Sequence, residues 1–468
     1  MNLIYNVKDK PKFGQLIAFA FQQLLAIMAA TIAVPAIVGN GMTASAALFG
    51  AGVGTIVYQL FTRFRSPVFL GSSFAFLGSM FAAFAGAASM EMGYLGLIIG
   101  AAFAALVYVV IAIIVKAAGV KWITKLMPAV VIGPTVAIIG LALAGNAVGD
   151  MLTGDIVDAN GAVLTSPYVA LICALVTLFV VIICSTFGGK RIRLIPFIIG
   201  ILAGYLVALV FTLIGGTSNN DALKVIDFEP FKALFKGGVS FTTFVSLPDF
   251  TILKAWNGFE KLTGAYVGTI AVAYIPVAFV VFAEHIADHK NLSSIIGKDL
   301  LTDPGLSNTL LGDGVGSFVG AVFGGCPNTT YGESIGCVAI TGNASVISIT
   351  AAAVLAILSA FVSPFVAFLD TIPACVMGGV CMTLYGFIAV SGLKMLQPVD
   401  LNENRNLFVA SVILIAGVGG MSLDFVLSGG QTITITEVAC ALILGIITNL
   451  VLSGKKTDGK DEPQQIIK

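Results

Sequence analysis

The sequence predicts an all-α polytopic membrane protein with about fourteen membrane-spanning segments. Three observations support this fold class: the composition, the length of the apolar stretches, and two sequence echoes that relate one half of the chain to the other. Of the 468 residues, 58% are hydrophobic and only 10% are charged, so a water-soluble fold could not bury this much apolar surface. The apolar runs are continuous and do not alternate, which argues against the strands of a barrel.

The clearest predicted spans are apolar stretches that can cross ~30 Å of hydrocarbon as a helix, which takes about 20 residues. They lie at residues 95–115, 167–186, 195–213, 351–369 and 434–452. Two further segments, near residues 66–85 and 326–346, are rich in Gly, Ser, Thr and Pro. We expect these two to be interrupted rather than continuous helices.

Charge placement predicts the orientation of the chain. Lysine and arginine cluster before the first predicted span, after even-numbered spans and in the C-terminal tail. The positive-inside rule therefore predicts that both termini lie in the cytoplasm. We expect a multi-pass protein of the cell inner (plasma) membrane. The net charge of zero argues against a nucleic-acid partner, and the seven cysteines lack the spacing of a metal site.

Two echoes indicate an internal duplication. The heptapeptide at residues 127–133, Met-Pro-Ala-Val-Val-Ile-Gly, recurs at 372–378 as Ile-Pro-Ala-Cys-Val-Met-Gly, an offset of 245 residues. Ser-Ser-Phe-Ala at 72–75 matches Thr-Thr-Tyr-Gly at 329–332 in residue type, an offset of 257. Two halves of about seven spans each must be inverted relative to each other, as in many secondary transporters. Interrupted segments at corresponding positions of two such halves point to a binding site.

Ionisable groups inside the spans are few, and each costs about 2.5–3.5 kcal/mol at a helix centre. One cluster is Ala-Glu-His-Ile-Ala-Asp-His at 283–289, which holds both histidines of the chain, and a second site is Glu333. On one helix Glu284 and Asp288 share a face, whereas His289 lies about 140° round from Glu284.

Each of these groups has a structural alternative. Residues 283–289 would also suit a helix end with its charged groups in water, and Glu333 would also suit acceptance from freed backbone amides. Asp313 resembles a helix-end residue, and Glu437 resembles a packing carboxylate.

Two buried carboxylates beside interrupted helices suit a neutral planar ligand that has N–H donors and C=O acceptors. The carboxylates accept from the ring N–H groups, and backbone N–H groups donate to the carbonyl oxygens. Burial disfavours the charged form of a carboxyl group, so such a group can take up a proton on one side of the membrane and release it on the other.

At these residues the sequence resembles the nucleobase/ascorbate transporter family, also called nucleobase:cation symporter family 2, and most closely its bacterial uracil permease branch. The resemblance runs over nearly the whole chain, and its most specific parts lie at residues 22–31, 71–76, 283–289, 298–305 and 327–336. The family signature appears as Glu333-Ser-Ile-Gly336 followed by Thr341-Gly342, with Ser334 in place of the usual Asn.

The resemblance implies two inverted seven-span repeats that build a core domain (spans 1 to 4 and 8 to 11) and a gate domain (spans 5 to 7 and 12 to 14). Short antiparallel strands are implied within spans 3 and 10. The expected divisions are a cytoplasmic segment at 1–12, core at 13–120 and 263–370, gate at 121–215 and 371–453, an extracellular loop at 216–262 and a cytoplasmic tail at 454–468. A homodimer through the gate domains is also implied.

The resemblance further implies that Glu284 and Glu333 hold a base, and that the backbone amides of Phe74 and Gly332 bind its carbonyl groups. Ala30 and Tyr331 would line the site.

Proton coupling would involve Glu284 together with Asp288 or His289. The enteric uracil permeases carry a His four residues after the first Glu, where this chain has Asp288, and helix geometry favours Asp288 over His289 for that role. The Glu284/Asp288 pair would also suit a sodium ion as the coupling ion.

The expected function is therefore uracil import coupled to protons, with no cofactor. The alternatives are a xanthine or other nucleobase symporter, with proton or sodium coupling, and an anion transporter of the same fold, against which Glu333 argues. A membrane-embedded enzyme is disfavoured, because the sequence has no protease-type arrangement: Glu284 precedes the first histidine of 283–289, whereas the zinc motif His-Glu-x-x-His has the Glu directly after it.

Overall fold

The computed structural model describes residues 3–119, 121–158, 160–189, 192–426 and 432–453. In this part of the chain, eight helical segments are long and apolar enough to cross a membrane. They are α1 (Phe13–Val38), α2 (Ala44–Phe61), α4 (Met90–Ala118), α6 with α7 (Ala129–Met151), α8 (Pro167–Phe187), α9 (Pro196–Thr217), α13 (Gly264–Ile296) and α18 (Ala374–Lys394). Shorter apolar helices cover Phe74–Ala85, Val346–Ser359, Asn404–Val418 and Glu437–Ser453. The predicted class of helical polytopic membrane protein is confirmed.

Large apolar side chains are exposed at helical spacing on the outer helices, as expected for surfaces that face lipid. On α9 they are Leu202, Leu206, Val210 and Leu213.

Three of the five predicted spans are continuous helices, and two are not. Residues 95–115 and 167–186 lie within α4 and α8, and residues 196–213 lie within α9, which begins one residue after the predicted start. The prediction of one helix over 351–369 is wrong: the chain breaks between α16 (Val346–Ser359) and α17 (Ser363–Asp370), where Val362 forms a β-bridge with Val245. Pro364 stands in the first turn of α17, a position that favours a new helix start.

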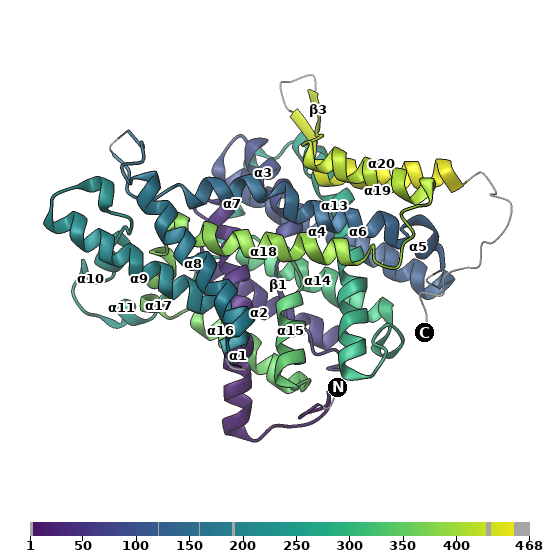
Figure 1. Ribbon diagram of the computed structural model, residues 1–468, viewed down its shortest axis with the longest axis horizontal. Helices are drawn as coiled ribbons and strands as arrows, with labels where there is room; N and C mark the ends of the chain where they lie inside the picture. Colours follow the sequence, from purple (N-terminus) through teal and green to yellow (C-terminus); the bar gives the residue numbers. More distant parts are fainter. Residues whose placement is uncertain (1–2, 120, 159, 190–191, 427–431, 454–468) are drawn as a thin grey trace.

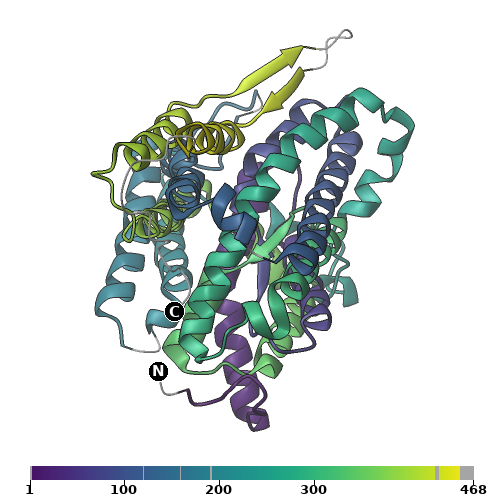
Figure 2. The same cartoon turned by 90° about the vertical axis from the view of Figure 1, so that its right-hand side faces the viewer.

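The span predicted over residues 434–452 is wrong at its beginning. Strand β4 (Thr432–Ile435) precedes α20 (Glu437–Ser453), and β4 pairs antiparallel with β3 (Leu423–Val426). The run Thr-Ile-Thr-Ile is β-branched throughout and favours a strand over a helix. This hairpin projects from the helices in both views (Figures 1 and 2).

The helices pack into two bundles, which lie side by side in Figure 2. The first bundle contains α1 to α4 and α13 to α16, together with two short strands at its centre. Its remaining elements are β1 (Leu70–Ser72), the 3-10 helix η1 (Phe74–Phe76), α3 (Leu77–Ala85), the π-helical turn η5 (Leu301–Gly305), α14 (Leu306–Gly324), β2 (Asn328–Thr330) and α15 (Gly332–Thr341).

Strands β1 and β2 pair antiparallel, with Gly71 opposite Thr329. The two interrupted segments of the sequence are therefore short strands that meet each other, as predicted. The helices around the strands pack in corresponding pairs, in which α1, α2 and α4 of one half match α13, α14 and α16 of the other. The contact of α4 with α14 matches that of α16 with α2, and the contact of α4 with α13 matches that of α16 with α1.

Helices α2 and α14 approach closely because glycines face each other across their contact. Gly50 lies against the backbone of Gly320 and Gly324, and Gly54 lies against the backbone of Gly316. Small residues allow this approach in a membrane, where helix association depends on packing rather than on expulsion of water.

We expect Gly50→Val to destabilise the protein by about 3 kcal/mol, because the new side chain would collide with the Gly320 carbonyl oxygen. The measurement is the melting temperature and the monodisperse yield in detergent. Gly386→Val is the matched control, since a Cβ there, in the middle of α18, meets no atom within 4 Å. Equal stability of the two variants would contradict the role of the α2 and α14 contact.

The second bundle contains α6 to α9 and α18 to α20. Its smaller elements are α5 (Lys121–Leu126), η2 (Ile192–Leu194) and α19 (Asn404–Val418). Pro128 and Pro373, the prolines of the first echo, cap the N-termini of α6 and α18.

The glycines of the same echo make matching contacts. Gly133 of α6 packs against Gly392 of α18 and against Leu396, which lies just after the end of that helix. Gly378 of α18 packs against Ala147 and Met151 of α7. Gly392 follows Ala147 in the sequence by 245 residues, and Leu396 follows Met151 by the same number, which is also the separation of Gly133 and Gly378.

The segment at 216–262 forms short helices rather than an extended loop (Figure 1, left). These are η3 (Asp221–Leu223), α10 (Glu229–Phe235), α11 (Phe241–Phe244), α12 (Thr251–Ala255) and η4 (Trp256–Lys261). They pack against both bundles, since α12 and η4 contact α4 whereas η3 contacts α9.

One ion cluster joins the two halves of the first bundle outside its spans. Asp303 in η5 pairs with Lys298 at 2.6 Å and with Arg65 at 2.7 Å. Hydrogen bonds from Lys298 and Arg65 lower the pKa of Asp303 to about 2, so this carboxylate stays charged at physiological pH.

Candidate functional site

A helix begins directly after each of the two central strands. η1 begins at Phe74 and leads into α3, and α15 begins at Gly332. The first N–H groups of a helix have no partner inside it, and the helix dipole makes that end positive. Both interruptions thus present backbone donors at the centre of the first bundle, and Phe74 and Gly332 are the two residues predicted to bind a ligand through their amides.

The start of α15 borders open space. Gly332 is exposed although its neighbours Tyr331 and Ser334 are buried, and a Cβ placed on Gly332 would meet no atom within 4 Å. The phenol of Tyr331 donates to the Ser72 carbonyl at 2.7 Å, which fixes the ring against β1. Ala30 is buried on α1, a helix that packs against β1, α3 and α15.

Phe74 joins the two bundles. Its ring meets Tyr385 of α18 edge-on, with 5.5 Å between the ring centroids. The space at the interrupted helices therefore lies next to the interface between the first and the second bundle.

Three carboxylates converge on this region. Glu284 and Asp288 are half-buried on α13, which packs against η1, β2 and α15. Asp288 Oδ2 accepts from Thr330 Oγ1 at 2.7 Å, and the charges of Glu284, Asp288 and Glu333 lie within interaction range of one another.

The alternative that residues 283–289 form a helix end is wrong, because α13 continues to Ile296. The helical spacing that places Glu284 and Asp288 on one face is confirmed.

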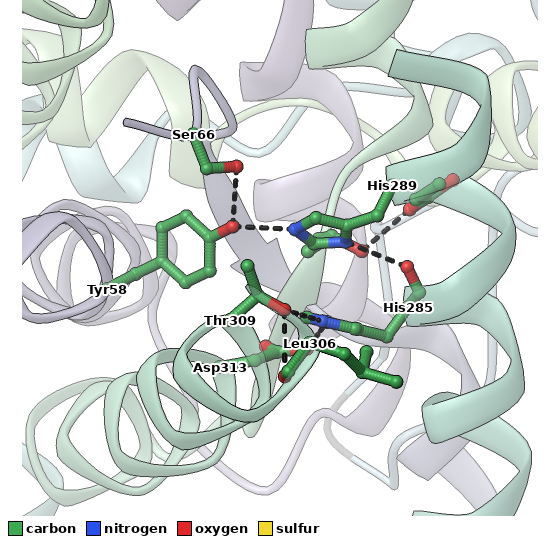
Figure 3. A network of polar contacts seen from close by, with 9 residues as sticks. Tyr58, Ser66, His285, His289, Leu306, Thr309 and Asp313 are labelled. Carbon is green, nitrogen blue, oxygen red and sulfur yellow. Dashed lines mark hydrogen bonds and ion pairs between the residues drawn. The ribbon is translucent and has the colours of Figure 1, made fainter. Parts of the chain in front are cut away.

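His289 lies elsewhere. It is fully buried, its Nδ1 donates to the His285 carbonyl at 2.8 Å, and its Nε2 lies 2.7 Å from the Tyr58 hydroxyl (Figure 3). Neither ring nitrogen faces the carboxylates of α13. Among the described residues, no three or more His, Cys, Asp or Glu side chains are arranged to hold a metal ion.

The interpretation of Asp313 as a helix-end residue is wrong. Asp313 is fully buried in the middle of α14, and its Oδ2 lies 2.7 Å from His285 Nδ1. The flanking Gly312 and Gly314 suggest a helix boundary in the sequence, but here they allow close packing against α2 and α4. An ionisable group within an apolar, glycine-rich run was the available signal.

Ser334, which replaces the usual Asn of the family signature, ties α15 to its surroundings. Its hydroxyl oxygen accepts from Gln23 Nε2 of α1 and from the Phe69 backbone N–H, the latter at 3.1 Å. The sequence argument missed Gln23, although it is a polar residue within an apolar span.

A cavity of about 460 Å³ lies between the C-terminal end of α9 and the segment at 216–262, and it is lined by none of these carboxylates. Thr212, Lys224, Asp227 and Lys232 are among the residues that line it. It contains none of the predicted site residues, so we do not place the site there.

The fold and the site together define a polytopic membrane transporter: two helices begin in the middle of one bundle, near half-buried carboxylates and beside the contact with the second bundle. The chain belongs to the family described as the Permease family (Xan_ur_permease), whose model matches residues 14–425. This confirms the predicted family resemblance.

Two relatives match the chain almost from end to end. The uracil permease of Bacillus caldolyticus is 39% identical over 455 residues, which cover 97% of this chain and 95% of the relative. The uracil permease of Bacillus subtilis (strain 168) is 37% identical over 462 residues, which cover 98% and 97%.

Among solved structures, the transmembrane domain of the bicarbonate transporter BicA from a cyanobacterium has the same fold. The TM-score is 0.59 at 14% identity, over 95% of this chain and 99% of that domain.

Proposed function

We propose that the protein imports uracil together with protons. The observation that carries the proposal is the convergence of the carboxylates of Glu284 and Glu333 on the open start of α15 at Gly332. The end-to-end similarity to two uracil permeases supports the substrate.

Uracil is an uncharged planar ring with two N–H donors and two C=O acceptors, and the site offers the complementary groups. Glu284 and Glu333 accept from the ring N–H groups, and the backbone N–H groups of Gly332 and Phe74 donate to the carbonyl oxygens. Hydrogen bonds to charged acceptors are worth about 1.5–3 kcal/mol each, which makes the two carboxylates the main determinants of affinity. Tyr331 and Ala30 line the site.

Coupling rests on the crowding of carboxylates. Three acidic groups within interaction range of one another disfavour full ionisation, so the site binds a proton more readily than an isolated carboxyl group does. We assign the exchange to Glu284 and Asp288 rather than to His289, because both ring nitrogens of His289 contact other groups. We propose a proton as the coupling ion, with sodium at the same carboxylate pair as the alternative that the uptake experiment below tests.

Transport follows from movement of the first bundle, as core domain, against the second bundle, as gate domain. Fourteen segments as two inverted seven-span repeats are supported by the pairing of β1 with β2, the reciprocal helix contacts and the 245-residue displacement of the contacts at Gly133 and Gly378. The contact of Phe74 with Tyr385 would open and close as the domains move. We further propose cytoplasmic termini in the plasma membrane and a homodimer through the gate domains.

Uptake of radiolabelled uracil into proteoliposomes tests the function. We expect accumulation that follows an inward proton gradient, collapses with a protonophore and is absent under a sodium gradient at equal pH. Unlabelled uracil should compete, whereas xanthine and bicarbonate should not. Uptake driven by sodium alone, or competition by bicarbonate, would replace this proposal with one of the alternatives.

A further inference from the structure

A second polar cluster surrounds the two histidines of α13 (Figure 3). We call it the histidine cluster; all its members are fully buried, and they come from α2, the segment before β1, α13 and α14. They are Tyr58, Ser66, His285, His289, Thr309 and Asp313. The proposed transport mechanism uses none of them.

The hydrogen bonds of His285 fix where its protons lie. Thr309 Oγ1 donates to the Leu306 carbonyl at 3.0 Å, so it accepts from His285 Nε2, also at 3.0 Å. His285 Nδ1 lies 2.7 Å from Asp313 Oδ2, a distance typical of a charge-assisted bond. With Nε2 carrying one proton, the contact to Asp313 must contain another. That proton can lie on either atom without changing the net charge of zero, and we assign it to the imidazole, which makes the pair an imidazolium and a carboxylate.

His289 remains neutral in this arrangement. Its ring lies 4.0 Å from the ring of His285 between centroids, so two positive charges would repel strongly. His289 Nδ1–H donates to the His285 carbonyl at 2.8 Å, and Nε2 lies 2.7 Å from the Tyr58 hydroxyl.

The charge of Asp313 acts on the substrate side of α13. Its carboxylate interacts electrostatically with both Glu284 and Asp288, and Glu284 is the residue directly before His285. His285 is the only His, Lys or Arg side chain that pairs with Asp313 among the described residues.

The other titratable groups near the pair are Tyr58 of α2, Tyr108 of α4, and His289 and the carboxylates of α13. Glu333 of α15 interacts in turn with Glu284 and Asp288. Tyr108 contacts the His285 ring edge-on at 6.4 Å between centroids. None of these groups supplies a positive charge in place of His285.

We propose that His285 and Asp313 form a positioning pair that sets the pH range of transport. The imidazolium cancels the charge of Asp313, which would otherwise act on the proton-binding carboxylates Glu284 and Asp288. This inference rests on the proposed function, because it assumes that uptake requires a proton on those carboxylates.

The test measures the pH at which uracil uptake is half-maximal. His285→Asn leaves the Asp313 charge uncompensated, which favours a proton on Glu284 and shifts the midpoint upward by about one pH unit. Asp313→Asn leaves the imidazolium uncompensated and shifts the midpoint downward. The double variant should return close to the midpoint of the unchanged protein, and Thr309→Val is the control that removes a partner without removing a charge.

A purely structural pair would give a different pattern: lower rates at every pH with one common midpoint, or shifts of both variants in one direction. Either result overturns the inference while the proposed function stands. Absence of uptake by the unchanged protein would instead overturn the proposed function.

Nuclear magnetic resonance provides a readout that needs no transport. The chain has two histidines, so ¹⁵N-histidine labelling gives two imidazole sets. The signals that disappear in His285→Asn belong to His285. We expect them to show an imidazolium at pH 7 in the unchanged protein. In Asp313→Asn, His285 should lose its proton at a lower pH than in the unchanged protein. A neutral His285 at pH 7 in the unchanged protein would overturn the inference.

Discussion

Glu284→Gln is expected to reduce uracil uptake by roughly 100-fold, the largest loss of any single carboxylate substitution in the chain. The variant replaces a charged acceptor for a ring N–H group with a neutral amide, which costs about 1.5–3 kcal/mol of binding. It also removes a group that exchanges the coupling proton. Both losses act on the same step, so the initial rate of uptake driven by a proton gradient should fall further than the binding affinity measured in detergent.

Glu437→Gln is the matched control for this substitution. Glu437 is also a half-buried carboxylate, but it lies in the first turn of α20, in the second bundle. Its change should leave the uptake rate within about twofold. If Glu284→Gln and Glu437→Gln had equal rates, the assignment of the site would fail, although the fold would be unaffected.

Much of the first bundle could be predicted because the signals are local. The dense Gly, Ser, Thr and Pro content near residues 66–80 and 326–341 marks the two breaks, and the structure has β1 and β2 there. Spacing of four residues placed Glu284 and Asp288 on one face of a helix, and this required only helix geometry.

The sequence argument failed where the structure depends on a contact between residues distant in the sequence, or on a local preference that competes with the apolar pattern. Asp313 was interpreted as a helix-end residue because its partner, His285, is 28 residues away. The break at 360–362 depends on a bridge to Val245, and no property of an apolar run indicates such a partner. Strand β4 had a local signal in its β-branched residues, but the apolar character of the region outweighed it in the prediction.

Gly332→Val should abolish measurable uracil binding while the protein stays folded. Gly332 starts α15 in an ordinary helical conformation, and a Cβ there meets no atom within 4 Å, so the new side chain strains neither backbone nor packing. It would instead occupy the space that we assign to uracil and cover the N–H groups at the helix start. The measurement is the dissociation constant for uracil by isothermal titration calorimetry, together with the melting temperature without ligand.

Gly268→Val separates this steric effect from a general response to valine in a helix. Gly268 lies in the N-terminal part of α13, where a Cβ also meets no atom within 4 Å, so both variants exchange glycine for valine in open space. Without ligand, the melting temperatures of the two variants should agree within a few degrees, because neither new side chain collides with the protein. Uracil should stabilise the Gly268→Val protein and leave the melting temperature of Gly332→Val unchanged. If uracil stabilised both proteins equally, the ligand would have to bind away from the start of α15, and the carboxylates of α13 would lose their role as its acceptors.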